Sequence, residues 1–145
     1  EMPDFLPDRI EAGTHNMPGI AGLLAGVRFV RRQGTQAILH HEHALTCRTA
    51  ENLRRLPGVE VFALPGCPAQ AGVVSFRVSG QDAETVGEAL ARRGIAVRAG
   101  LHCAPLAHRT AGTLDTGTVR VSFSAFNTPQ EADRLAEAVG DILRR

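Results

Sequence analysis

Residues 97–105 read Val97-Arg98-Ala99-Gly100-Leu101-His102-Cys103-Ala104-Pro105, and the rest of the chain is organised around them. The apolar run Gly94-Ile95-Ala96-Val97 leads into this stretch and predicts a strand over 95–97, which Gly100 then ends. Pro105 is expected to keep its neighbours from forming a helix. The stretch is therefore predicted to be a strand followed by a loop.

Cys103 is the first candidate for a catalytic residue, because a cysteine on a loop after a strand is expected to be accessible rather than packed in the core. The neighbouring His102 and the upstream Arg98 are cationic groups that favour the nucleophilic thiolate. Further along, Arg120 stands in the run Thr118-Val119-Arg120-Val121-Ser122-Phe123, whose alternation of apolar and polar residues predicts a second strand. If the two strands pair, Cys103 and Arg120 face one site. The alternative is an inert loop cysteine beside a surface arginine.

Length and composition indicate one ordinary domain. The chain has 145 residues, 43% of them hydrophobic, and a formal net charge of +1. This charge gives no support to a nucleic-acid or anionic-membrane partner, and no apolar run reaches the length of a membrane span. No signal peptide is visible. Three widely spaced cysteines argue against a disulfide framework and for a reducing, cytoplasmic compartment.

The chain contains no lysine, since all sixteen of its Lys and Arg residues are arginine. Any mechanism that needs a lysine amine, such as a Schiff base, therefore cannot be completed within these residues. The sequence also begins at Glu1 rather than at methionine. We expect it to be a piece of a longer protein.

The remaining elements are predicted from hydrophobic periodicity, caps and breakers. We expect helices over 20–32, 35–56, 81–93 and 128–143, and strands over 59–64, 72–78, 95–97 and 118–123. Thr128, Pro129 and Glu131 form a capping box at the start of the last helix, and 101–117 is predicted to be a long functional loop. This order predicts an α/β sandwich, with one small, mainly antiparallel sheet and helices packed on it.

Two weaker motifs each have two interpretations. Gly13 and Thr14 offer the flexible backbone, N–H and hydroxyl of a phosphate-binding turn, or they form a plain loop before a helix capped by Asn16. His40 and His43 share a helix face and could be a metal half-site, although solvated or packed histidines are favoured and no metal site is expected.

The other two cysteines are expected to be structural. Cys47 lies within a helical pattern and is predicted to be a packed thiol. Cys67 lies in the turn Pro65-Gly66-Cys67-Pro68 between two predicted strands.

Several of these residues together resemble the C-terminal part of a cysteine desulfurase. Such enzymes depend on pyridoxal phosphate, have the class V aminotransferase fold and include selenocysteine lyases among their relatives. The resemblance covers nearly the whole chain and lies in Glu11-Ala12-Gly13-Thr14, Gly19-Ile20, Gly22-Leu23, Arg98 to Ala104, Val119-Arg120 and Asn127 to Leu135. It implies the small C-terminal domain of that fold over 17–145, with 1–16 as a lead-in from a missing large domain.

The resemblance also implies roles for individual residues. Cys103 would be the nucleophile that takes sulfur from L-cysteine, giving alanine and a cysteine persulfide. Arg120 would hold the substrate carboxylate, and Arg98 would line the mouth of the site. Gly13 and Thr14 would contact the cofactor phosphate across the interface of a homodimer. A sulfur-acceptor protein and iron–sulfur cluster assembly are further implications.

The resemblance has one large departure, because the family's Schiff-base lysine lies upstream of the matching segment. The chain alone is therefore not expected to form an aldimine with pyridoxal phosphate or to desulfurate cysteine. Two alternatives stay open. One is a generic class V aminotransferase domain in which Cys103 is incidental, and the other is a non-enzymatic thiol or sulfur-carrier module.

Overall fold

The structure is a computed structural model that describes residues 3–11, 13–67 and 70–144. Ala12 of the Glu11–Thr14 motif and Pro68 of the predicted turn lie outside the described residues. The chain divides into two compact units, Glu1–Thr35 and Gln36–Arg145. The domain boundary at residue 16 concerns the longer protein and stays a prediction.

The first unit contains a short 3-10 helix, Asp8–Ile10, and the helix α1, Met17–Gln33. The Asn16 side chain accepts a hydrogen bond of 3.0 Å from the N–H of Gly19, which confirms the predicted cap. No residue of α1 is buried within this unit, although its sequence has helical apolar spacing. Among the described residues, no helix is long and apolar enough to cross a membrane.

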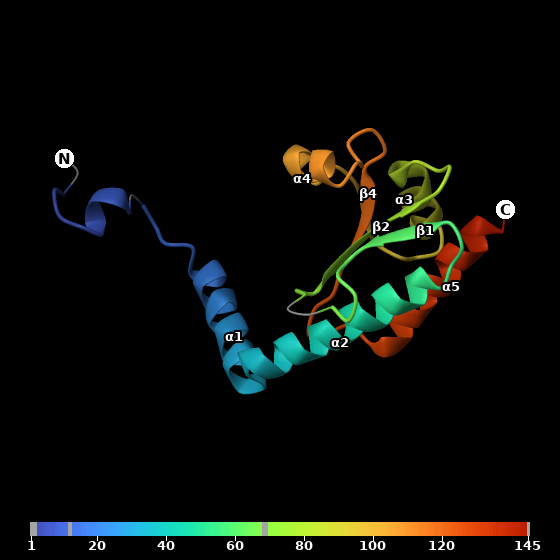
Figure 1. The fold of residues 1–145 in the computed structure, drawn as a ribbon. Helices are drawn as coiled ribbons and strands as arrows, with labels where there is room; N and C mark the ends of the chain where they lie inside the picture. The colour runs from blue at the N-terminus through green and yellow to red at the C-terminus, as the bar shows by residue number, and fades with distance from the viewer. Residues whose placement is uncertain (1–2, 12, 68–69, 145) are drawn as a thin grey trace. The chain divides into compact units, whose positions relative to one another are not determined.

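The second unit is built on a four-stranded antiparallel sheet with the strand order β1-β2-β4-β3 (Figure 1). The strands are β1 Val59–Phe62, β2 Val73–Val78, β3 Arg98–Gly100 and β4 Thr118–Ser122. The helices are α2 Thr35–Arg54, α3 Ala83–Ala91, α4 Pro105–Thr110 and α5 Pro129–Leu143. In Figure 1, α2 and α5 lie together on one side of the sheet, and α4 lies on the other side. The predicted α/β sandwich is confirmed.

Alternation along the strands separates the two faces of the sheet. In β2 every second residue is buried, and in β4 Val119 and Val121 are buried on the same face, and these side chains pack against the helices to form the core of the unit. The core is made of Leu53 of α2, Val74, Phe76 and Val78 of β2, Val86 and Leu90 of α3, Val119 and Val121 of β4, and Leu135, Val139 and Ile142 of α5. The opposite face of the same strands carries polar residues and is where the candidate site lies.

Helix ends agree with the caps read from the sequence. Thr128 and Glu131 form the capping box that begins α5. The N–H groups of Gly94 and Ile95 bond to the carbonyls of Ala91 and Leu90 at 2.9 and 3.1 Å, which is a Schellman motif at the end of α3. Gly94 has φ 73°, as the residue after such a helix end requires.

The strand predicted over 95–97 is wrong by three residues, because β3 begins at Arg98. The N–H of Ile95 is already engaged in closing α3, so it does not pair in the sheet. A pocket of about 290 Å³ also lies between 94–96 and 121–123, and it separates this segment from β4. The strand that does form, β3, pairs with β4, which meets the condition set for Cys103 and Arg120 to face one site.

The predicted loop over 101–117 contains the helix α4, so the expectation that Pro105 excludes a helix is wrong for the residues after it. Pro105 is the first residue of α4, where a missing N–H costs nothing because that group has no partner within a helix. Ala104, which precedes the proline, stays non-helical with φ −126°.

We expect Gly94→Ala to lower the free energy of unfolding by about 1 kcal/mol, because an L side chain is strained at positive φ. Gly94→Asn is the matched control and should lose less, since asparagine tolerates this conformation. Urea unfolding followed by circular dichroism measures both changes. Equal stability of the wild type and the alanine variant would contradict this account of the end of α3.

Candidate functional site

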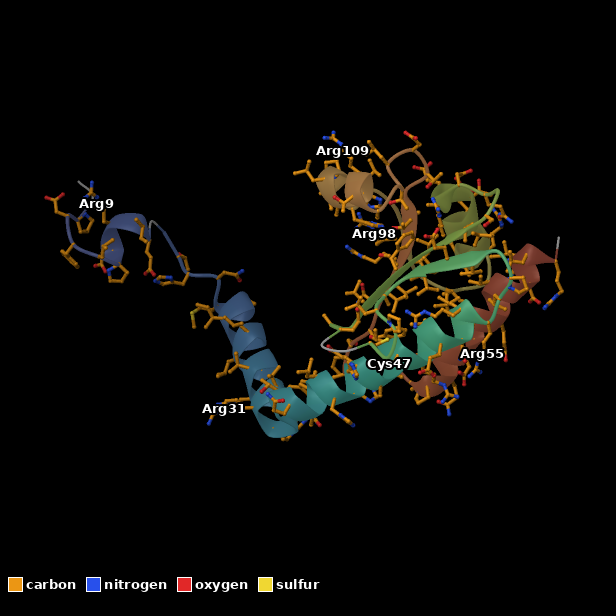
Figure 2. The ribbon with its side chains drawn as sticks, in the orientation of Figure 1. Arg9, Arg31, Cys47, Arg55, Arg98 and Arg109 are labelled. Carbon is orange, nitrogen blue, oxygen red and sulfur yellow. The ribbon has the colours of Figure 1, made fainter. Side chains whose placement is uncertain are left out.

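Two arginines lie opposite each other on adjacent strands. The antiparallel register pairs Arg98 of β3 with Arg120 of β4, and Arg120 with Ser75 of β2. Because Val119 and Val121 point into the core, the side chain of Arg120 projects from the other face of the sheet. Figure 2 shows Arg98 beside β4, on the side of the sheet where α4 lies.

In the part of the chain that the structure describes, no carboxylate pairs with either arginine. Among the residues that the structure describes, neither Arg98 nor Arg120 makes a hydrogen bond or an ion pair, and the buried Nε of Arg120 has no partner. Like charges placed directly opposite on adjacent strands destabilise a sheet. A planar anion with two oxygens, such as a carboxylate, would relieve the repulsion and could accept from a guanidinium fork. The arrangement is therefore suited to binding a carboxylate.

Cys103 lies in a strained turn shortly after β3. The N–H of Ala104 bonds to the carbonyl of Leu101 at 2.9 Å, and the two central residues, His102 and Cys103, have φ 50° and 58°. Positive φ at both central positions is typical of a type I′ turn, which prefers Asn-Gly. Holding a histidine and a cysteine there costs conformational energy. The turn thus keeps an exposed thiol at a position where a more stable sequence would have glycine.

His102 connects this turn to β4. Its Nε2 donates a hydrogen bond of 3.1 Å to the carbonyl oxygen of Thr118, so the ring carries its proton on Nε2, and its buried Nδ1 has no partner among the described residues. Partial burial lowers the pKa of His102, the hydrogen bond to Thr118 opposes this shift, and electrostatic interactions with Arg120, His108 and Arg98 lower the pKa further. The imidazole is therefore neutral at neutral pH, so the expectation that His102 is a cationic neighbour of Cys103 is wrong.

The base of the loop is closed by two glycines. Gly100 pairs with Thr118 across the strands, and a Cβ atom added to Gly117 would lie 2.9 Å from Cα of Gly100. Only glycine at position 117 permits this close backbone approach. Within the loop, Nδ1 of the buried His108 is 2.8 Å from Oγ1 of Thr113, which fastens α4 to the following turn.

The other two cysteines are in different environments. Cys67 is buried with 1% exposure, as expected for a structural residue, and Cys47 is partly buried. Burial, the neighbouring Cys67 thiol and the charge of Glu51 raise the pKa of Cys47 to about 11. His43 donates from Nε2 to the carbonyl oxygen of Cys67 at 2.6 Å, so it takes part in packing this turn. The described residues contain no cluster of three potential metal ligands.

Gly13 and Thr14 lie in the first unit, in the loop before α1. Gly13 has φ 92°, and the N–H and hydroxyl of Thr14 have no hydrogen-bond partner among the described residues. Open donors next to a left-handed glycine are what an anion-binding turn requires. The loop therefore has donors that could bind an anion, and the phosphate-binding role of Gly13 and Thr14 stays a prediction.

Sequence reasoning named Cys103, Arg98 and Arg120 as candidates, and their roles stay predictions, but it missed how the structure holds them. The strain of the turn has no sequence signal, because histidine and cysteine are unusual in a type I′ turn. Ser75, which faces Arg120, could have been found from the alternation of β2. The role of His102 as a link to β4 depends on a contact sixteen residues away along the chain.

Known proteins resemble this chain over most of its length. The family model described as aminotransferase class V matches residues 4–135. A cysteine desulfurase from Synechococcus elongatus is 41% identical over 136 residues, which are 94% of this chain and 21% of that protein. A probable cysteine desulfurase from Mycobacterium leprae is 37% identical over 92% of this chain and 31% of its own length. The chain thus spans a fifth to a third of these relatives.

Solved structures resemble the chain in the same way. The apo structure of a cysteine desulfurase from Thermococcus onnurineus has a TM-score of 0.85 and 37% identity over 95% of this chain and 34% of its own. The cysteine desulfurase CsdA from Escherichia coli has a TM-score of 0.82 and 30% identity, over 95% of this chain and 33% of its own. The match of the family model to most of the chain shows that the protein belongs to the class V aminotransferase family.

Proposed function

We propose that this chain is the C-terminal part of a pyridoxal-phosphate-dependent cysteine desulfurase, in which Cys103 takes sulfur from L-cysteine. The observation that carries the proposal is the pair Arg98 and Arg120, two guanidinium groups without a protein anion, close in the chain to an exposed thiol in a strained turn. Such an arrangement suits a reaction in which a substrate that carries a carboxylate transfers sulfur to a thiol. The names of the relatives in sequence support the same reaction.

The residues of this chain are suited to hold part of pyridoxal phosphate and of its substrate. The open donors of Gly13 and Thr14 suit its phosphate, and the arginine pair suits the carboxylate of its substrate. No lysine is available in these residues for a covalent link, so this chain would supply only a share of the complete site. When bound, pyridoxal phosphate supplies the electron sink that stabilises negative charge on the substrate carbons.

The roles of this chain's own residues follow from their chemistry. Arg120, assisted by Arg98, holds the carboxylate of L-cysteine through charge-assisted hydrogen bonds. The Cys103 thiolate then attacks the substrate sulfur, so that a sulfur–sulfur bond forms while the bond between the substrate's sulfur and its β-carbon breaks. That carbon keeps the electron pair and takes a proton, which gives alanine and leaves Cys103 as a persulfide.

The wider setting of the enzyme is also a proposal. We infer a homodimer in which Gly13 and Thr14 serve the neighbouring site, a sulfur-acceptor protein that takes the persulfide sulfur, and a role in iron–sulfur cluster assembly. The odd number of cysteines favours a reducing compartment such as the cytoplasm. A generic aminotransferase remains the competing function, since it would keep Arg120 and the phosphate loop but would not need Cys103.

Limiting alkylation of this chain should label Cys103 before Cys47 and Cys67. Cys103 is exposed, Cys67 is buried, and the pKa of about 11 leaves Cys47 mostly protonated. At a pH of about 8 only on the order of one Cys47 thiol in a thousand would be ionised. Peptide mapping by mass spectrometry reads the order of labelling, and the unfolded chain, which should lose this order, is the control. Preferential labelling of Cys47 in the folded chain would count against the proposed nucleophile.

In the complete enzyme, Arg120→Lys should raise the Michaelis constant for L-cysteine by about ten- to a hundredfold. A lysine ammonium loses the bidentate fork, and a hydrogen bond to a charged group contributes about 1.5–3 kcal/mol. Steady-state sulfide release measures the effect. Arg109→Lys, the same change at an exposed residue of α4, is the matched control and should leave the kinetics unchanged. Unchanged constants in Arg120→Lys would exclude the carboxylate role.

A further inference from the structure

Among the described residues of the Cys103 turn, His102 is the one whose side chain makes a hydrogen bond to another element, the strand β4. We propose that His102 is a positioning residue, whose imidazole fastens the turn that carries Cys103 to the strand that carries Arg120. The inference rests on the proposed function, because it names the residue that keeps the thiol within reach of the carboxylate anchor. It assigns His102 a role that is geometric rather than acid–base.

Contacts between His102 and Thr118 make this connection. Nε2 of His102 donates to the carbonyl oxygen of Thr118 at 3.1 Å, and Oγ1 of Thr118 lies 3.4 Å from the same nitrogen. Thr118 is two residues before Arg120 and therefore on the same face of β4. The His102 side chain thus connects the turn that carries Cys103 to β4, at a position two residues before Arg120.

The turn needs an external tie because its own conformation is unfavourable. His102 and Cys103 both have positive φ, and neither is glycine. Such a pair persists only where the surrounding structure holds it. Among the described residues, the side-chain hydrogen bonds from this turn to the sheet are those of His102 Nε2 with Thr118, while the carbonyl oxygen of Ala104 accepts from the N–H of His108 in α4.

The surroundings of His102 disfavour a role as proton donor or base. Its Nε2 proton is engaged by a backbone carbonyl, and its Nδ1 is buried without a partner. The charged or titratable groups that act on the ring are Arg120 of β4, Arg98 of β3 and His108 of α4, and all three disfavour its protonation. The ring of His108 packs against it with centroids 5.9 Å apart. A neutral ring with these neighbours is suited to a structural hydrogen bond rather than to proton transfer.

The test compares two alkylating reagents on this chain without cofactor. Iodoacetate carries a carboxylate that Arg98 and Arg120 would hold, whereas iodoacetamide is neutral. The ratio of their rates at Cys103, read by mass spectrometry of its peptide, therefore reports whether the thiol lies beside the arginine pair. In the folded wild type we expect this ratio to exceed that of the urea-unfolded chain by up to about fivefold, the effect of a partly exposed charge pair.

Two substitutions isolate the hydrogen bond. Asparagine tolerates positive φ, so His102→Asn should keep the turn, but its shorter amide should not reach Thr118. We expect the ratio in His102→Asn to fall towards the unfolded value while the urea midpoint stays close to that of the wild type. His102→Gln places an amide nitrogen near the position of Nε2 and should restore the ratio. His40→Asn, at an exposed residue of α2, is the matched control and should change nothing.

Each outcome bears on a different claim. A high ratio that is unchanged in His102→Asn would overturn the positioning role and leave the proposed function intact. A low ratio in both His102→Asn and His102→Gln would overturn the role of the bond to Thr118. A wild-type ratio equal to that of the unfolded chain would instead overturn the carboxylate site of Arg98 and Arg120, and with it the proposed function.

Discussion

The antiparallel register of β3 and β4 is the constraint on which the site depends. It places Arg98 opposite Arg120 on the face of the sheet that the core does not use. Two like charges at this spacing are unfavourable without an anion, and none of the described residues supplies one. A shift of β3 by one residue would turn the side chain of Arg98 to the core face, while β2 still holds Arg120 in its register. The pairing of the two arginines therefore lowers the stability of the sheet, but it leaves both guanidinium groups able to bind an anion.

The loop after β3 is arranged around the same two strands. Gly100 and Gly117 bring its ends together, and α4 fills its middle with the buried His108. Strain is concentrated where the chemistry is proposed, in the consecutive left-handed residues His102 and Cys103. A sequence chosen for stability would have Asn-Gly in such a turn. The departure from local preference thus coincides with the candidate nucleophile.

Local sequence signals predicted the elements well, because caps and periodicity act over a few residues. The capping box of α5 and the end of α3 at Gly94 are examples. The start of β3 was misplaced because the N–H of Ile95 is used by α3, a competition that hydrophobicity does not reveal. The candidate residues Cys103 and Arg120 came from residue type, spacing and resemblance. Their geometry could not be predicted, since it depends on the contact of His102 with Thr118 and on the close approach of Gly100 and Gly117.

The central claim is that Cys103 accepts sulfur from a substrate held by Arg120. The most direct measurement uses the longer protein that contains this chain, loaded with pyridoxal phosphate and incubated with L-cysteine labelled with heavy sulfur. Peptide mapping by mass spectrometry then locates the transferred atom. The account predicts one heavy sulfur atom on the peptide of Cys103 and none on those of Cys47 and Cys67. Alanine formation with no heavy sulfur on Cys103 would contradict it.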